Sequence, residues 1–388
     1  MALTDINDMR THAYRHGYAL GAFAIPDLES LVGVIAAAEA YRAPVLLVPE
    51  AADEHRRKLL LPAVEAAARD AQVPVGIQAA VAGDREAASS AIRLGCNGLR
   101  VRETGGSFPQ SVQQAQEIAA LAHACGLSVE AEPGTNVVTT PAEAKRFVEG
   151  SGVEGLWLDL GVRDSERSGK GRPDYDRVKR IHKELNAPLG IDAGNGLSED
   201  QYLRLIRHGV AVFEFRAPTK DEDPVAESVS AQAEQALRIW GAAGRAAEVR
   251  AQCAPWEAAE QILLCNFPGA SENEMDERLS QGELTLAGIP GVRDVVGGKA
   301  AEEAPYRYAW RVRLCHPKAL SHFQQHPERH AFTHGGTHSS AEDCIWIHYR
   351  CGGRDGGTQR DPQERPFAEG SSTADLEHVA ARTPRKLA

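Results

Sequence analysis

Residues 129–135 read V-E-A-E-P-G-T, a short apolar strand pattern that ends on a carboxylate and then meets the turn-forming pair Pro-Gly. Side chains two residues apart on a strand point to the same side, so Glu130 and Glu132 face whatever the strand encloses. A buried acid is costly unless it is paired or binds something. The stretch therefore predicts either an internal ion pair or a functional site at the end of a strand.

Short apolar runs alternate with amphipathic helical segments on both sides of this stretch, from residue 1 to about 245. The predicted strands cover residues 19–24, 44–48, 73–78, 98–102, 127–132, 156–160, 188–192 and 211–215. Thr140-Pro141 with Glu143, and Ser198, are typical helix starts. Eight such units favour an α/β fold of the (β/α)8 TIM-barrel type over residues 1–245. A doubly wound open sheet is the alternative, but the sequence lacks its G-x-G-x-x-G turn.

The pattern changes after the eighth unit. Residues 246–258 read as a linker or the end of the last helix, and residues 259–350 follow the order β-α-β-β-α-β of an α+β, ferredoxin-like domain. Here Ser271 with Glu274 predicts a helix start, and a helical stretch is expected over 317–332. Residues 351–388 are rich in Gly, Arg, Asp, Gln, Ser and Pro, which predicts a largely disordered tail.

Net charge, cysteine spacing and the lengths of apolar runs exclude several classes of protein. The 388 residues carry a formal net charge of -11, which argues against nucleic acid and anionic membranes as partners. The seven cysteines include no C-x-x-C pair, so we expect reduced thiols and a cytoplasmic protein. The first residues lack the apolar core of a signal peptide, and no apolar run is long enough to cross a membrane.

The first domain resembles the class II (metal-dependent) fructose-bisphosphate aldolase family between about residues 5 and 218. The similar segments, in matching order, are 17–29 (GYALGAFAIPDLE), 43–52 (APVLLVPEAA), 73–81 (VPVGIQAAV), 126–135 (GLSVEAEPGT) and 187–196 (APLGIDAGNG). The resemblance implies a barrel enzyme that makes or breaks C–C bonds, holding a zinc ion with three histidines and moving a proton with an aspartate.

The residues that the family uses for chemistry are largely replaced. Ala80 stands at the position of the catalytic Asp, and Val81 at the position of a metal-binding His. The other two histidine positions hold residues 163–165 (R-D-S) and Asp192. The three-His zinc site is therefore absent. Carboxylates in place of imidazoles shift the expected metal from Zn²⁺ towards Mg²⁺ or Mn²⁺, or towards no metal.

Polar residues nevertheless fall at the carboxyl ends of the predicted strands, where barrel enzymes build their sites. As candidates for catalysis we select Glu132, Asp192, Glu214 and Arg102, with Glu132 and Asp192 also as metal ligands. The predicted substrate contacts are Gln78, Gly194, Asn195, Gly196, Arg216 and Lys170. The arginines suit an anionic substrate, and the Gly-Asn-Gly turn before a helix suits a phosphate. The alternative is a ring of internal salt bridges without a ligand.

The second domain resembles the stress-responsive dimeric α/β-barrel (Dabb) family, in residues 289–298 (IPGVRDVVGG), 306–314 (YRYAWRVRL) and 326–332 (HPERHAF). The resemblance implies a homodimer and a pocket near His326, Arg329, His330 and Tyr308. Histidines also stand at 322, 326, 330, 334 and 338, a spacing that would chelate a metal on one continuous helix. Pro327 and the pair Gly335-Gly336 argue against such a helix.

The leading hypothesis is an aldolase-like lyase, or an isomerase acting next to a carbonyl. Its substrate would be a small polar carbonyl compound, with or without a phosphate, in a specialised biosynthetic pathway. Two alternatives stay open. One is a non-catalytic binding or scaffold protein with a degenerate barrel, and the other places cyclisation-type chemistry in the pocket of the second domain.

Overall fold

The computed structural model describes residues 2–50, 54–102, 105–133, 139–158, 173–192, 197–216, 225–267, 271–334 and 343–350. These residues belong to one compact unit, Met1–Cys351. The predicted tail, residues 351–388, lies outside the described residues. None of the described helices combines the length and the apolar character needed to span a membrane.

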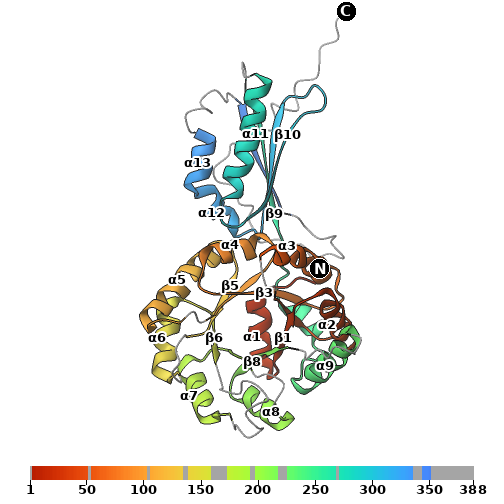
Figure 1. Ribbon diagram of the computed structural model, residues 1–388, viewed down its shortest axis with the longest axis vertical. Helices are drawn as coiled ribbons and strands as arrows, with labels where there is room; N and C mark the ends of the chain where they lie inside the picture. Colours follow the sequence, from red (N-terminus) through yellow and green to blue (C-terminus); the bar gives the residue numbers. More distant parts are fainter. Residues whose placement is uncertain are drawn as a thin grey trace, which may run out of the picture. The chain divides into compact units, whose positions relative to one another are not determined.

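Eight parallel strands close into a barrel, as predicted (Figure 1). They are β1 (Leu20–Ile25), β2 (Val45–Pro49), β3 (Val75–Val81), β4 (Gly98–Val101), β5 (Ser128–Ala131), β6 (Gly155–Leu158), β7 (Leu189–Asp192) and β8 (Val210–Phe215). Strand β8 pairs with β1 through Leu20 and Val212, which closes the sheet and rules out the open-sheet alternative.

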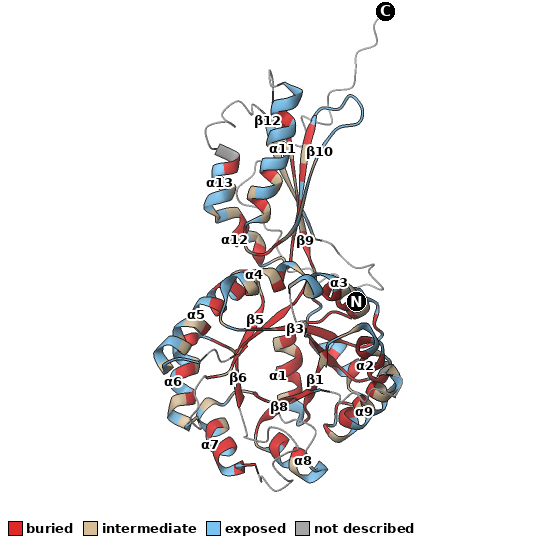
Figure 2. Ribbon diagram, viewed as in Figure 1, coloured by how far each residue is buried: buried red, intermediate tan, exposed pale blue. Residues whose placement is uncertain are grey.

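An outer ring of helices covers the strands (Figure 1). It comprises α2 (Leu28–Ala40), α3 (Glu54–Asp70), α4 (Arg85–Arg93), α5 (Phe108–Ala124), α6 (Pro141–Ser151), α7 (Tyr175–Leu185), α8 (Glu199–Arg207) and α9 (Val225–Ile239). Figure 2 shows buried residues along the strands and exposed ones on the outer faces of the helices. The capping boxes at Thr140 and Ser198 are present, so both predicted helix starts are confirmed.

A helix that the sequence analysis did not predict, α1 (Ile6–His16), closes one end of the barrel (Figure 1). A Cβ atom added at Gly76 would lie 2.6 Å from Ile6, and one at Gly98 would lie 2.7 Å from the same side chain. These glycines stand near the starts of β3 and β4, so α1 packs against the amino end of the barrel. The opposite end, where the strands finish, is the mouth.

A four-stranded sheet of order β10-β11-β9-β12 follows the barrel. Its elements are β9 (Ala259–Asn266), α11 (Glu272–Ala287), β10 (Val292–Lys299), β11 (Tyr308–Leu314), α12 (Ala319–Gln325), α13 (Pro327–His334) and β12 (Asp343–Arg350). The single helical stretch expected over 317–332 is two helices, because Pro327 begins a new one. Residues 246–258, read as a linker or helix end, contain the short helix α10 (Ala246–Gln252).

Helices α11 to α13 cover one face of this sheet. The Trp310 ring stacks edge-on against Phe332 of α13, and its Nε1 donates to the Leu279 carbonyl of α11. The sheet also contacts the barrel helices. Arg293 of β10 forms a two-point ion pair with Glu65 of α3, with N–O distances of 2.6 and 2.5 Å.

The expectation of reduced thiols is wrong for one pair of cysteines. Cys265 and Cys344 form a disulfide, with their Cα atoms 4.4 Å apart. The two residues lie directly opposite each other on the neighbouring antiparallel strands β9 and β12. Their separation of 79 residues gives no sign of this pairing, because only the register of the sheet brings them together.

Candidate active site

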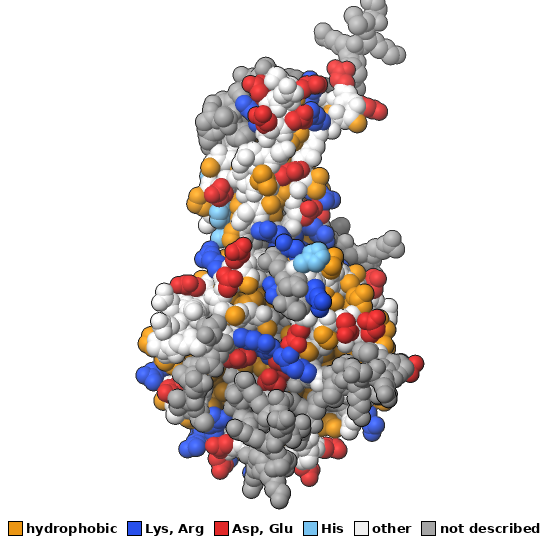
Figure 3. Space-filling view, in the orientation of Figure 1, with side chains coloured by type: hydrophobic (Ala, Val, Ile, Leu, Met, Phe, Trp, Pro, Cys, Tyr) orange, Lys and Arg blue, Asp and Glu red, His pale blue; other side chains and the backbone are white. Residues whose placement is uncertain are grey.

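The barrel mouth gathers most of the predicted site residues. Arg102, Glu132 and Arg216 each follow directly on β4, β5 and β8, and Asp192 ends β7. Gln78 and Glu214 lie deeper, within β3 and β8, and both are buried. Four predicted contacts, Lys170, Gly194, Asn195 and Gly196, lie outside the described residues. Figure 3 shows acidic and basic side chains intermixed on this view of the barrel.

Glu214 is held by three arginines. Arg100 Nη1 donates to Glu214 Oε2, while Arg216 Nη2 lies 2.6 Å and Arg102 Nη2 lies 3.5 Å from Glu214 Oε1. Burial would raise the pKa of Glu214, but the charges of Arg100, Arg216 and Arg102 outweigh burial and hold the pKa below its ordinary value. Glu214 is therefore ionised at neutral pH and acts as a fixed anion at the base of the mouth.

A second carboxylate, Glu50, lies across the same arginines. Arg216 Nη1 is 2.5 Å from Glu50 Oε2, and Arg102 Nη2 is 3.4 Å from Glu50 Oε1. The side chains of Glu50, Arg102 and Arg216 are 26%, 37% and 45% exposed, whereas that of Glu214 is 0% exposed. The arginine pair is thus bound below by a buried carboxylate and above by an accessible one.

Beneath the mouth, Glu130 has its own set of partners. It accepts from Arg10 Nη1 of α1 at 2.6 Å, from Gln78 Nε2 at 2.5 Å and from Trp157 Nε1 at 2.8 Å. Burial would raise the pKa of Glu130, but Arg10 and the two neutral donors lower it below its ordinary value. Of the two acids in residues 129–135, Glu130 therefore has the structural role. The two-residue spacing of Glu130 and Glu132 alone could not show this.

Arg100 joins the two clusters. Its guanidinium carbon lies 4.1 Å from the centre of the Trp157 ring, and its Nε lies 3.9 Å from Glu132 Oε1. Arg100 Nε has no hydrogen-bond partner in the part of the chain that the structure describes. A chain of polar contacts therefore runs from α1 through the barrel interior to the mouth. A Cβ atom at Gly155 would collide with Arg10 Nη1, so this glycine makes room for the Arg10 guanidinium.

Four residues of this site were not predicted from the sequence: Arg10, Glu50, Arg100 and Trp157. Arg100 carried a signal, because it stands two residues before Arg102 on the same strand and so faces the same side. Glu50 ends the apolar run of β2 in the way that Glu132 ends β5. Nothing local marked Arg10, since its role depends on α1 packing across the end of the barrel.

Glu132 and Asp192 complete the mouth. Glu132 is 28% exposed, and Asp192 pairs in register with Glu214 and adds to the charges that raise the pKa of Arg216, against the opposing effect of burial. Within the described ranges no three His, Cys, Asp or Glu side chains are placed to hold a metal ion. The described side chains therefore do not form a metal site by themselves. Three guanidinium groups surround the Glu214 carboxylate instead.

The predicted pocket residues of the second sheet are spread over several elements. Tyr308 of β11 packs against Phe267, with ring centres 5.9 Å apart, and Arg329 of α13 lies over Trp346 at 4.6 Å. His326 stands at the break between α12 and α13, and His330 follows on α13. This break places His322 on α12 and His330 on α13, so these two histidines do not share one continuous helix. His338 lies outside the described residues.

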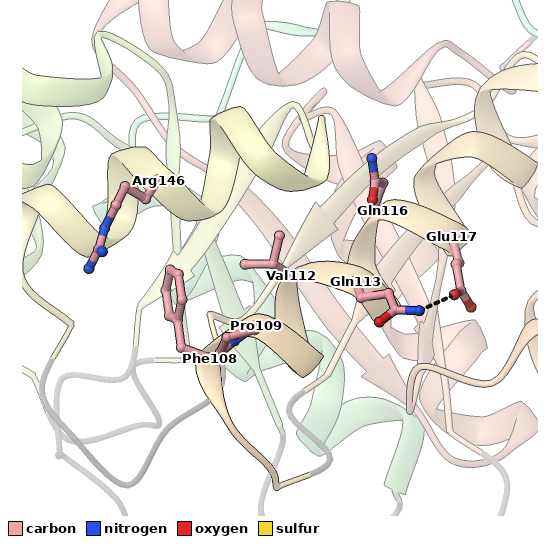
Figure 4. Close-up of a pocket in the computed structure, with 7 residues that line it drawn as sticks. All are labelled: Phe108, Pro109, Val112, Gln113, Gln116, Glu117 and Arg146. Atoms are coloured by element: carbon pink, nitrogen blue, oxygen red, sulfur yellow. Dashed lines mark hydrogen bonds between the residues drawn. The ribbon is translucent and has the colours of Figure 1, made fainter.

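A separate groove lies on the outside of the barrel, between α5 and α6 (Figure 4). Phe108, Val112 and Arg146 line it, and the Arg146 guanidinium carbon lies 5.3 Å from the centre of the Phe108 ring. None of the mouth residues described above lines this groove.

Comparison with known proteins agrees with the barrel. The family model described as fructose-bisphosphate aldolase class-II matches residues 4–247. A fructose-bisphosphate aldolase of Thermus caldophilus is 29% identical over 217 residues, covering 52% of this chain and 71% of that protein. One from Giardia intestinalis (strain ATCC 50803 / WB clone C6) is 29% identical over 221 residues, covering 52% of this chain and 68% of that protein.

Solved structures show the same fold. The YdjI aldolase of Escherichia coli K12 superposes with a TM-score of 0.56 at 24% identity, covering 63% of this chain and 99% of that one. The fructose-bisphosphate aldolase of Campylobacter jejuni gives a TM-score of 0.53 at 12% identity, covering 62% of this chain and 96% of that one.

Proposed function

This chain belongs to the class-II fructose-bisphosphate aldolase family, and we propose that it is an aldolase-like lyase that makes or breaks a C–C bond next to a carbonyl. The observation that carries the proposal is the charged mouth, in which Arg102, Arg216, Glu132 and Asp192 follow or end four different strands of a family barrel. Barrel enzymes place their chemistry at this end.

The proposed chemistry divides the mouth into two roles. Glu132 is the partly exposed acid beside Arg100, and we assign to it the removal of a proton from the carbon next to the carbonyl. The enolate that results must be stabilised by positive charge, and Arg102 and Arg216, which follow β4 and β8, provide it. Residues 159–172 and 193–196 lie outside the described residues, so Lys170 and the Gly194-Asn195-Gly196 turn stay predicted substrate contacts.

Proton exchange tests this assignment without knowledge of the second substrate. In D2O, ¹H NMR would follow the loss of the α-proton signal of hydroxyacetone, dihydroxyacetone phosphate and pyruvate in the presence of the protein. We expect exchange with at least one compound, and a rate lower by about 10²–10⁴-fold in Glu132→Gln, the usual effect of losing a general base. Glu149→Gln, on the exposed side of α6, should exchange at the wild-type rate.

A negative result in the proton-exchange experiment also decides between the proposals. Exchange at the background rate with all three compounds would contradict the lyase proposal. It would favour the non-catalytic binding protein, for which the closed set of ion pairs around Glu214 is the supporting observation. Equal exchange in wild type and Glu132→Gln would leave a lyase but remove Glu132 from its role.

For the second sheet we propose a ferredoxin-like, Dabb-type domain over residues 259–350 that makes the protein a homodimer. The order β10-β11-β9-β12 and the helix-covered face support this. The other face carries Ile262, Leu264, Ile345 and Ile347, which are partly exposed. A barrel domain of residues 1–245 and a linker of 246–258 complete the proposed organisation.

A further inference from the structure

We propose that the barrel mouth binds a small carboxylate ligand through Arg102 and Arg216, in the place that the Glu50 carboxylate occupies. If the protein is a lyase, as proposed above, its substrate is then a carbonyl compound that carries a carboxylate. This identification of the substrate rests on the proposed function. Binding itself is independent of any reaction and is tested separately.

The two carboxylates that contact Arg102 and Arg216 are unequally buried. Glu214 is fully buried and contacts Arg100, Arg102 and Arg216, so its removal would leave charges unpaired in the barrel. Glu50 has only Arg102 Nη2 and Arg216 Nη1 as its ion-pair partners among the described residues, at 3.4 and 2.5 Å. Arg102 Nη2 is shared with Glu214. Ion pairs that are open to solvent contribute little to stability, so a ligand could displace Glu50 at little cost.

The space between Arg102 and Arg216 fits a carboxylate chemically. Glu50 shows that the space between the two guanidiniums accepts a carboxylate with one oxygen on each arginine. Guanidinium groups suit planar, two-point recognition of such an anion. Glu214, fixed below, holds both arginines in place before any ligand arrives, so the site is preorganised.

A buried hydrogen-bond donor also lies beneath the mouth. Arg100 Nε is buried, has no hydrogen-bond partner among the described residues and lies 3.9 Å from Glu132 Oε1. A buried donor without a hydrogen-bond partner is unfavourable. An oxygen atom from a ligand or a water would relieve this cost, so the donor marks this side of the mouth as a place where a polar group is expected.

Titration of the full chain with pyruvate tests the proposal, with dissociation constants measured by ligand-observed NMR. Hydroxyacetone has the carbonyl without the carboxylate, and inorganic phosphate is the competing anion. We expect pyruvate to bind at least ten times more tightly than hydroxyacetone. Arg216→Gln should weaken pyruvate binding at least tenfold. Glu50→Gln should strengthen it several-fold, because the internal competitor loses its charge.

The matched control is Arg207→Gln, at an exposed position on α8, which should bind pyruvate as the wild type does. Unchanged or weaker binding in Glu50→Gln would overturn the displacement of Glu50. Tighter binding of phosphate than of pyruvate, with the same dependence on Arg216, would overturn the carboxylate assignment. Glu50→Gln keeps the test decisive even where Arg216→Gln does not fold.

The outcome separates this inference from the proposed function. Pyruvate binding with the expected variant pattern but no proton exchange on any compound would keep the carboxylate site and remove the lyase. Proton exchange with no dependence of pyruvate binding on Arg216 or Glu50 would do the reverse.

Discussion

At the scale of single residues, the barrel interior depends on the pairing of buried charges. Arg10 and Glu130 are 1% and 2% exposed in their side chains. Arg10→Met would leave Glu130 with only the neutral donors Gln78 and Trp157. We expect this variant to lose about 3–5 kcal/mol of unfolding free energy, the usual cost of an orphaned buried charge.

The double variant Arg10→Met/Glu130→Gln is the control for this prediction. It removes both charges while an amide remains to bond Trp157, so it should regain a large part of the loss. Urea unfolding followed by tryptophan fluorescence measures all three free energies. A double variant as unstable as Arg10→Met alone would show that packing of the Arg10 side chain, not its charge, matters.

The sequence was enough to predict where the charged residues of the mouth stand along their strands. It was not enough to predict their ion-pair partners. The alternation of a strand is local, so it placed Glu132, Arg102 and Glu214 correctly at or near the mouth. It could not assign Glu214 to Arg100, because this contact joins two strands that are far apart in the chain. Arg216, by contrast, stands only two residues from Glu214. The roles predicted for the mouth residues therefore stay proposals until the variants are measured.

At the scale of elements, one acid joins three segments of the barrel wall. Glu154, just before β6, lies 2.7 Å from His123 Nε2 of α5 and accepts from the Val129 backbone N–H of β5 at 2.8 Å. The hydrogen bond that His123 Nε2 donates to Glu154 raises the pKa of His123, although burial opposes it. The bond thus favours protonated histidine in the folded protein.

The sign of the pH effect follows from that shift. A histidine pKa that is raised on folding stabilises the protein fully below the unfolded value of about 6.5, and this stabilisation is lost as the pH rises through the folded pKa. Both side chains are substantially exposed, so we expect only about 0.2–1 kcal/mol. His123→Gln should therefore destabilise the protein more at about pH 5.5 than at about pH 8.5.

Urea unfolding of wild type and His123→Gln at both pH values measures this difference. His55→Gln, at an exposed position on α3, is the control and should show the same difference from wild type at both. A larger loss for His123→Gln at the higher pH would contradict the assigned direction.

Elements were predicted best where their ends carry a chemical signal. The capping boxes at Thr140, Ser198 and Ser271 are local, and all three are present. Helix α1 was missed although Asp5 caps its start and Gly17, with φ 67°, ends it. Its signals are of the same kind, but its place beneath the barrel comes from packing that a local pattern cannot show.

At the scale of the whole molecule, the second sheet has one covered and one partly exposed face. Trp310 and Trp346 point to the face under α11 to α13, whereas Ile262, Leu264 and Ile347 alternate to the other. Val296 and Tyr349 on that second face are 47% and 48% exposed. The same face also carries the Arg311–Asp294 ion pair beside these apolar side chains. Its apolar part favours association, because burying it removes apolar surface from water.

We expect two chains to pair through this face. Sedimentation velocity of the wild type should give a mass near twice the 41.8 kDa of one chain. Leu264→Glu places a charge at the middle of the face and should give the monomer mass. Leu284→Glu is the matched control, since Leu284 is 72% exposed on α11 at the covered side, and it should remain a dimer. A wild-type monomer, or a dimer that survives Leu264→Glu, would exclude pairing through this face, since a charge buried without a partner costs several kcal/mol.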